Sequence, residues 1–212
     1  MRLRLGIGVM LLLVSGCSTD GALQQASISV NCNPGDEGCE GMGLSAPLAR
    51  GSSVGLEAAV ISPGAGTPTV HFESARPDII AIDGNDVTGS STGISALMLM
   101  SGNTVIDFVH LTVVEADALS FLLPERGRRL EVNTHFQLLV EDDLRIEILP
   151  ERQSQRLLGA FDATWSVDGD AVVILDEGLP AERRLVATEP GLVNLTVEAL
   201  DFTAQLTLEV VQ

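Results

Sequence analysis

The sequence contains no lysine and no tyrosine, and only 3% of its 212 residues are aromatic. With so few aromatic side chains, we do not expect an exposed stacking platform for sugars or bases. Arginine is the only strongly basic residue type, and 12 arginines face 29 acidic residues, for a net charge of −17. Binding to nucleic acid needs a basic face, so this charge balance argues against that function.

Signals for catalysis and for bound cofactors are also missing. No Gly-x-Gly-x-x-Gly or Walker-type loop occurs. The histidines, His71, His110 and His135, each lack a second histidine two or four residues away. His71 and His135 alternate with apolar neighbours, so both are predicted to point away from the buried face of a strand. We therefore expect no catalytic residue, no cofactor and no metal ligand.

The apolar run near the N-terminus, residues 6–14, has nine residues, whereas a membrane-spanning helix needs about 20. A basic start and small residues at its exit are typical of a secretory signal peptide. Residues 13–17, Leu-Val-Ser-Gly-Cys, resemble the lipobox of bacterial lipoproteins. The resemblance implies cleavage before Cys17, acylation of Cys17 with palmitate-type chains, and anchoring in a membrane. It implies the outer membrane, because Ser18 and not aspartate follows; the alternative is an ordinary signal with an incidental cysteine.

Cys32 and Cys39 are the two cysteines left once Cys17 is assigned to the anchor. An even pair in an oxidising compartment predicts a disulfide, and the Pro34–Gly35 turn lets the two meet. A zinc site is the less favoured alternative, because two cysteines without a nearby histidine do not complete a shell of four ligands.

Patterns typical of β-strands cover most of the remaining chain. Alternating apolar residues predict half-buried strands at 54–60, 132–140, 193–199 and 202–210. Shorter apolar segments between turn residues predict further strands at 26–30, 70–72, 79–82, 94–100, 105–114 and 171–175. Short strands at regular spacing are typical of a β-sandwich or barrel, and Phe72 and Trp165 are expected to fill its cores.

The pattern repeats along the chain with a period of about 95 residues, the usual size of an immunoglobulin-like sandwich. Phe72 aligns with Trp165, and the segment that begins at Gly93 aligns with the one that begins at Gly191. Four segments of the first copy resemble bacterial immunoglobulin-like domains of group 2, the invasin/intimin (Big2-like) type: residues 72–74, 77–84, 86–89 and 93–97. The second copy lacks the proline and the Gly-x-Val-Thr turn and carries extra residues between its second and third strands. The resemblance implies a spacer or binding module without catalytic residues.

We therefore predict an all-β fold with two tandem immunoglobulin-like β-sandwiches after a signal peptide and a short tether. The expected boundaries are 1–16 for the signal peptide, 17–49 for the lipidated tether with its disulfide loop, 50–115 for the first sandwich and 116–212 for the second, with 26–30 as a candidate extra strand of the first. The linker at 114–118 has no Gly-Ser repeat, so we expect a semi-rigid rod.

The segment 145–160 is unusual because it carries Arg152 and Arg156 in an otherwise acidic protein. Pro150 and Gly159 bracket a predicted short helix. One hypothesis is that this segment buttresses the first domain, with its arginines meeting that domain's acids. The alternative is an exposed loop that binds a partner.

Three acidic turns, at 83–86, 141–143 and 168–170, offer oxygens that suit Ca²⁺. Asp, Asn and Gly are also the residues that tolerate turn dihedrals, and we favour that simpler interpretation.

The predicted function is that of a lipid-anchored protein of the cell envelope, facing the periplasm or the outside, with a non-enzymatic structural, adhesion or binding role. Its expected partners are the membrane, through the anchor, and a protein or cell-surface component, with no nucleic acid. The alternatives are an envelope enzyme subunit or cryptic hydrolase, and a carbohydrate-binding module.

Overall fold

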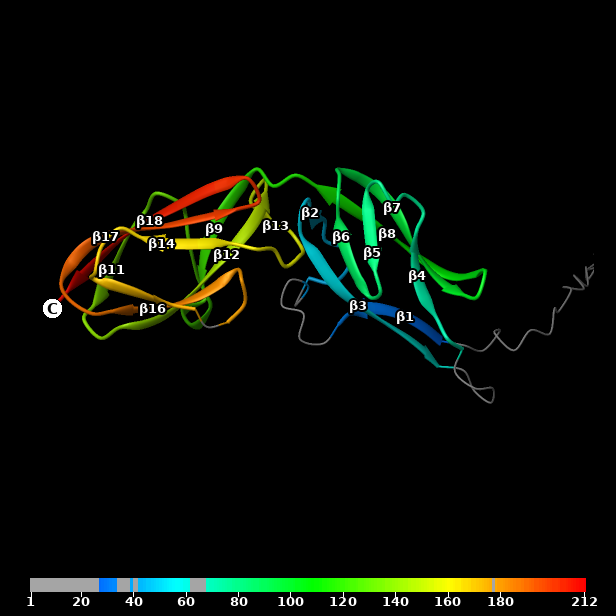
Figure 1. The fold of residues 1–212 in the computed structure, drawn as a ribbon, viewed down its shortest axis with the longest axis horizontal. Coiled ribbons are helices and arrows are strands. Elements are labelled where there is room, and N and C mark those ends of the chain that lie inside the picture. The colour runs from blue at the N-terminus through cyan, green and yellow to red at the C-terminus, as the bar shows by residue number, and fades with distance from the viewer. Residues whose placement is uncertain (1–26, 34–38, 40–41, 62–67, 177) are drawn as a thin grey trace, which may run out of the picture.

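The computed structural model describes residues 27–33, 39, 42–61, 68–176 and 178–212. These residues form two β-sandwiches arranged end to end, with the C-terminus at the outer end of the second (Figure 1). Each sandwich encloses its own hydrophobic core. The described part of the chain contains no helix long and apolar enough to cross a membrane.

The first sandwich consists of two four-stranded sheets with the strand orders β1-β3-β6-β5 and β2-β8-β7-β4. Its strands are β1 Ser27–Cys32, β2 Leu48–Ala49, β3 Ser53–Ile61, β4 His71–Ser74, β5 Ile80–Asp83, β6 Asp86–Gly89, β7 Gly93–Ser101 and β8 Thr104–Val114. Neighbouring strands are antiparallel except for β2 and β8, which are parallel.

The second sandwich repeats this plan with the orders β10-β9-β12-β16-β15, where β13 also pairs with β12, and β11-β18-β17-β14. Its strands are β9 Ala118–Leu123, β10 Arg128–Leu130, β11 His135–Leu139, β12 Asp143–Arg152, β13 Gln155–Arg156, β14 Thr164–Val167, β15 Val172–Leu175, β16 Glu182–Ala187, β17 Gly191–Ala199 and β18 Phe202–Val211. A single 3₁₀ turn, η1 (Pro124–Arg126), is the only helical element of the described residues.

Alternation along the strands places apolar side chains between the paired sheets. In β17 and β18 every second residue is buried, as the alternation at 193–199 and 202–210 predicts. The first core includes Leu56, Phe72, Ile80, Leu97, Leu99 and Leu111, and the second includes Phe121, Phe136, Ile146, Leu195 and Leu206. Trp165 is only partly buried and packs against the edge of the second core.

The all-β fold and the immunoglobulin-like sandwich architecture are as predicted. The strand expected at 26–30 is β1, which pairs with β3, so this strand and β2 belong to the first sandwich although both precede residue 50. Three strands of six or more residues were not predicted: β9, β12 and β16. β9 is apolar at five of its six positions and is buried on both faces, so it shows no alternation with a period of two.

Candidate functional site at the junction of the two sandwiches

The junction is formed by a backbone pairing between the two sandwiches. The Leu158 amide donates to the Pro47 carbonyl at 2.8 Å, and the Ala49 amide donates to the Leu158 carbonyl at 3.0 Å. Ser53 and Ala160 exchange two hydrogen bonds, of 2.8 and 2.7 Å. Residues 157–160 of the second sandwich therefore extend the sheet edges of the first by strand-like pairing.

A glycine and a serine make this close approach of two backbones possible. Gly159 has a φ of +115°, and a Cβ atom added to it would lie 1.9 Å from the Ser52 hydroxyl oxygen and 2.5 Å from the Ser52 Cβ. Ser52 is completely buried, and its hydroxyl lies 2.8 Å from the Ala49 carbonyl and 3.1 Å from the Leu158 carbonyl. Only glycine fits this position without a shift of the neighbouring chain.

Apolar contacts reinforce the pairing. The Leu158 side chain is 1% exposed and belongs to the core of the first sandwich, although the residue comes from the second. A separate small cluster fills the space between the cores, with buried Ala49, Ala116 and Leu157 at its centre and Val114, Leu200 and Phe202 packed against it. Burying a leucine side chain contributes about 1.5–3 kcal/mol, so these contacts favour one fixed arrangement of the two sandwiches.

The linker between β8 and β9 is tied to the β12–β13 hairpin. The Asp117 amide donates to the Glu151 carbonyl at 2.9 Å, and the Asp117 carboxylate accepts from the Gln153 amide at 2.9 and 3.2 Å. The linker therefore has fixed hydrogen-bond partners, in agreement with its lack of flexible repeats.

Charged side chains also meet at the junction. Arg50 of the first sandwich lies 2.9 Å from Glu115 of the linker and 3.4 Å from Asp201 of the second sandwich. In the second sandwich, Glu151 is nearly buried, and its carboxylate is 2.5 Å from the Ser120 hydroxyl and 2.7 Å from Arg129. Because a buried carboxylate needs such partners, Glu151 also fixes how β12 lies against β9.

The structure corrects two expectations about the segment 145–160. The helix predicted between Pro150 and Gly159 is wrong: β12 runs to Arg152, and a tight turn leads into β13. Pro150 has no amide hydrogen, and it lies in β12 past the last residue that pairs with β16, Glu147; its carbonyl accepts from the Leu157 amide at 2.9 Å. The segment does contact the first sandwich, as the buttress hypothesis states, but through backbone and apolar groups.

The arginines predicted to reach the first domain do not do so. Arg156 pairs with Glu147 at 3.0 Å, within the second sandwich, and Arg152 is exposed. The ion pair that does cross the junction is the one between Arg50 and Asp201. Only residues after β13 pair with the first sandwich, through their backbone. Arg152 and Arg156 come before that point, in β12 and β13 of the second sandwich.

Of the predicted site cysteines, Cys17 lies outside the described residues. Cys32 and Cys39 form a disulfide with a Cα–Cα distance of 5.8 Å. Cys39 is 1% exposed and packs in the first core, so this disulfide holds the end of β1 against the sandwich.

All three histidines are exposed, and they lie on different strands. His71 lies 3.1 Å from Glu73, and His135 lies 3.2 Å from Glu209. The His110 ring is almost perpendicular to the Phe108 ring, with 5.4 Å between the centroids. No group of three or more His, Cys, Asp or Glu side chains arranged for a metal ion is found in the described part of the chain.

Two of the three acidic turns, at 141–143 and 168–170, contact neighbouring residues of their own sandwich. Asp168 accepts from the backbone and side-chain nitrogens of Asn194, at 2.6 and 2.8 Å, and these hydrogen bonds lower the pKa of its carboxyl. Asp143 forms an ion pair with Arg184, which lowers the pKa of Asp143. Both carboxylates act as turn and cross-strand partners.

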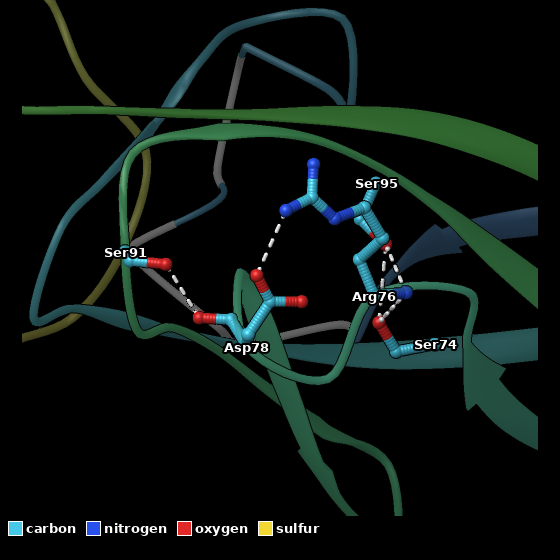
Figure 2. A network of polar contacts seen from close by, with 5 residues as sticks. All are labelled: Ser74, Arg76, Asp78, Ser91 and Ser95. Atoms are coloured by element: carbon cyan, nitrogen blue, oxygen red, sulfur yellow. Dashed lines mark hydrogen bonds and ion pairs between the residues drawn. The ribbon is translucent and has the colours of Figure 1, made fainter.

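Serine hydroxyls have structural partners in the loops of the first sandwich (Figure 2). The Arg76 amide lies 3.0 Å from the Ser95 hydroxyl and 3.2 Å from that of Ser74. The Arg76 guanidinium donates to Asp78 at 2.9 Å, which lowers the pKa of Asp78, and the Ser91 hydroxyl donates to the Asp78 carbonyl at 2.5 Å. This network fastens the loop between β4 and β5 to β7 and to the loop that precedes it.

Two Gly-x-Ser-x-Gly patterns occur in the first sandwich, at Ser53 and Ser91. A nucleophilic serine in this pattern sits on a turn from a strand to a helix. Ser53 begins β3 and lies 2.7 Å from the Thr88 hydroxyl, and Ser91 lies between two strands. Neither hydroxyl bonds to a histidine in the described structure, so neither position has the geometry of a nucleophile elbow.

Each sandwich has an open groove along the same edge. The groove of about 490 Å³ beside β4 is lined by His71, Glu73 and Ser74 among others, but the Ser74 hydroxyl points to Ser95. The groove of about 410 Å³ beside β14 is lined by Trp165, whose ring lies 6.0 Å from the Arg183 guanidinium and whose indole N–H donates to the Pro180 carbonyl. Neither groove joins a nucleophile to a base or presents a free aromatic face.

Sequence reasoning did not identify the residues that make the junction. Ser52, Gly159 and Leu158 carry no motif, and the only signal was that the segment before Ala160 is an insertion relative to the first copy. The burial of Glu151 was not predicted, because an acidic residue is normally expected to be exposed.

No family model matches the chain, and no curated protein matches it. Solved structures with a similar fold include domains 4 and 5 of the surface-layer protein SbsC, at 15% identity over 75% of this chain and 83% of that chain, with a TM-score of 0.33. InvD of Yersinia pseudotuberculosis is 12% identical over 78% of this chain and 55% of that chain, with a TM-score of 0.32. The Escherichia coli adhesin FdeC is 12% identical over 89% of this chain and 64% of that chain, with a TM-score of 0.34. At these identities the likeness concerns the fold alone.

Proposed function

We propose that this protein is a non-enzymatic spacer of the cell envelope, anchored to a membrane through Cys17, that holds its second sandwich at a fixed distance and orientation. The observation that carries the proposal is the junction. Four backbone hydrogen bonds join residues 157–160 to residues 47–53, and a buried leucine of the second sandwich completes the core of the first. Two domains that only follow each other along a chain do not need such a connection.

The absence of assembled chemistry in the described residues is consistent with this role. Their histidines are exposed on separate strands, and the serines in the Gly-x-Ser-x-Gly patterns bond to structural partners. The acidic surface suits a solvated exterior domain, because a high net charge favours solubility. In this proposal the spacer presents a surface to a protein or cell-surface partner.

Gly159→Ala tests the spacer. The added methyl group collides with Ser52, and the backbone conformation itself costs of order 1–3 kcal/mol for a residue other than glycine. We expect small-angle scattering to report a wider distribution of interdomain distances, while circular dichroism still reports two folded sandwiches. Gly127→Ala is the matched control, because Gly127 also has a positive φ, of 55°, but nothing lies near its Cβ position. Identical scattering from Gly159→Ala and the unmodified chain would contradict the proposal.

Cys17→Ala tests the anchor. Loss of several acyl chains removes about 0.8 kcal/mol of membrane affinity per buried methylene, so the variant should leave the membrane fraction. Its unfolding curve should stay unchanged, because β1, the first described strand, begins at Ser27. Retention in the membrane fraction, or loss of the folded sandwiches, would disprove the anchor as stated.

A further inference from the structure

Within the part of the chain that the structure describes, residues 104–112 of β8 have an unpaired outer edge, whereas the equivalent edge of the second sandwich is paired. In the second sandwich, β11 pairs parallel with β18 along five residues, His135–Leu139. In the first, β2 pairs with β8 at only two positions, Val113 and Val114. The nine-residue stretch 104–112 of β8 therefore has a neighbouring strand on one side only in the described structure.

The reason is the path of the chain before β2. Pro47 has no amide hydrogen to continue the ladder, and its carbonyl accepts from Leu158 on the other side. Just before it, the Ala46 amide donates to the Gly43 carbonyl in a turn. The chain before β2 therefore turns away from the edge of β8, whereas the equivalent strand of the second sandwich, β11, continues along β18.

The backbone groups of this edge are positioned for another strand. The Val114 carbonyl accepts from the Arg50 amide at 2.8 Å, so the backbone N–H and C=O of Val114 point away from β7. In an antiparallel ladder this direction alternates, so the backbone groups of Thr112, His110 and Phe108 also point away from β7. The described structure gives the amides and carbonyls of Thr112 and His110 no partner. The Phe108 amide donates to its neighbour's carboxylate, that of Asp107, at 2.8 Å.

Apolar side chains accompany the open edge. Phe108 and Ile94 are each 58% exposed, and Val105 is 48% exposed. Phe108 pairs with Met98 on β7, and Ile94 lies four residues back along the same strand. Edge strands are normally protected against pairing by charges or bulges. In β8 the only such features are the register shift opposite Leu99 and Met100 of β7 and the carboxylate of Asp107.

We propose that β8 is a docking site for an extended strand of another protein, with apolar residues at alternate positions and an arginine or lysine that pairs with Asp107. Strand addition satisfies the amides and carbonyls of His110 and Thr112 and places a side chain of the new strand beside Phe108. The Asp107 carboxylate occupies the Phe108 amide, which an added strand would need as a donor. An arginine or lysine on the added strand would pair with that carboxylate and free the amide, so charge complementarity predicts a basic residue there. The site lies outside the junction, so a failure of this proposal would not contradict the spacer proposal, and a failure of the spacer proposal would not contradict this one.

A second copy of the chain is the disfavoured occupant. Antiparallel pairing of two β8 strands over 104–112 centres on Phe108 and places the two Asp107 carboxylates diagonally on one face. Like charges so placed are destabilising. Each copy also carries a net charge of −17, so the two chains repel each other before contact.

The test uses a labelled nine-residue peptide of alternating threonine and valine with arginine at its centre, added to the full chain. We expect saturable binding by fluorescence anisotropy and slowed amide exchange at His110 and Thr112. A peptide with glutamate at the centre should bind about tenfold more weakly, and Asp107→Ala should abolish that difference. Phe108→Lys should abolish binding, whereas Leu192→Lys is the matched control, an exposed apolar position (66% exposed) on the second sandwich.

Three outcomes would overturn the proposal. The first is no binding and no protection at His110 and Thr112. The second is equal affinity for the arginine and glutamate peptides. The third is a dimer of the chain in sedimentation analysis that Phe108→Lys dissociates, which would make the second copy the occupant.

Discussion

At the scale of single residues, the sandwiches depend on carboxylates that have definite partners. Asp168 joins the loop after β14 to β17 through both nitrogens of Asn194, and Asp78 pairs with Arg76 inside the loop between β4 and β5. Glu151 does the same inside the second sandwich, with Ser120 and Arg129. In this acidic chain, hydrogen bonding to individual carboxylates therefore offsets part of the mutual repulsion of the negative charges.

The lowered pKa of Asp168 predicts a pH dependence of stability. Its folded pKa lies below the ordinary value of 3.8, because the Asn194 nitrogens stabilise the carboxylate. The unfolded chain then binds the proton more readily, so the stabilisation is present above the ordinary pKa and is lost as the pH falls through the folded pKa. We expect urea unfolding at pH 2–5 to show stability falling below about pH 4, with a shallower fall for Asp168→Asn. Parallel profiles for the two proteins would disprove the assignment.

At the scale of secondary structure, the turn between β12 and β13 determines how residues 157–160 reach the first sandwich. Gln153 and Ser154 both have a positive φ, of 52° and 63°. A two-residue hairpin turn with this geometry favours asparagine followed by glycine. The sequence has neither residue there, so the turn stores strain next to the junction.

Replacing both residues should therefore stabilise the second sandwich. Gln153→Asn with Ser154→Gly relieves positive φ at two positions, and we expect a gain of about 1 kcal/mol in the free energy of unfolding. The hydrogen bond to Asp117 is kept, because it uses the backbone amide of residue 153. Urea denaturation measures the gain, and an unchanged or lowered midpoint would show that the turn is not strained.

At the scale of the whole molecule, the two sandwiches are joined mainly by backbone pairing and apolar burial. The ion pairs of Arg50 are exposed at the surface, and such pairs contribute about 0–1 kcal/mol. The arrangement of the sandwiches should therefore resist salt, which screens surface charges but not buried contacts.

We predict that Arg50→Ala leaves the small-angle scattering profile unchanged, and that the profile of the unmodified chain is the same at low and at high salt. Gly159→Ala provides the contrast, since it disturbs the backbone pairing itself. A salt-dependent maximum dimension, or a wider distance distribution for Arg50→Ala, would show that charge holds the junction.

Much of the fold could be predicted because it depends on local pattern. Alternation in β17 and β18 reports one buried face, and the matching positions of Phe72 and Trp165 report the repeat. The hairpin after Pro150 could not be predicted, because a proline and a glycine around polar residues indicate a helix as readily as a strand that bends into another domain. The pairing of Leu158 with Pro47 and Ala49 joins residues more than 100 positions apart, and no local pattern encodes such a contact.

Composition and short-range spacing were enough to predict the all-β class and the tandem repeat, and they are the basis of the expected anchor at Cys17 and of the acidic net charge that argues against nucleic-acid binding. The tertiary structure was needed to show that the segment before Ala160 completes the first sandwich, that Gly159 has no room for a side chain, and that residues 104–112 of β8 are unpaired on one side within the described chain. These features depend on which backbones meet in space. The same pattern of alternating residues describes a covered edge in β18 and an open one in β8, and only the path of the preceding chain distinguishes them.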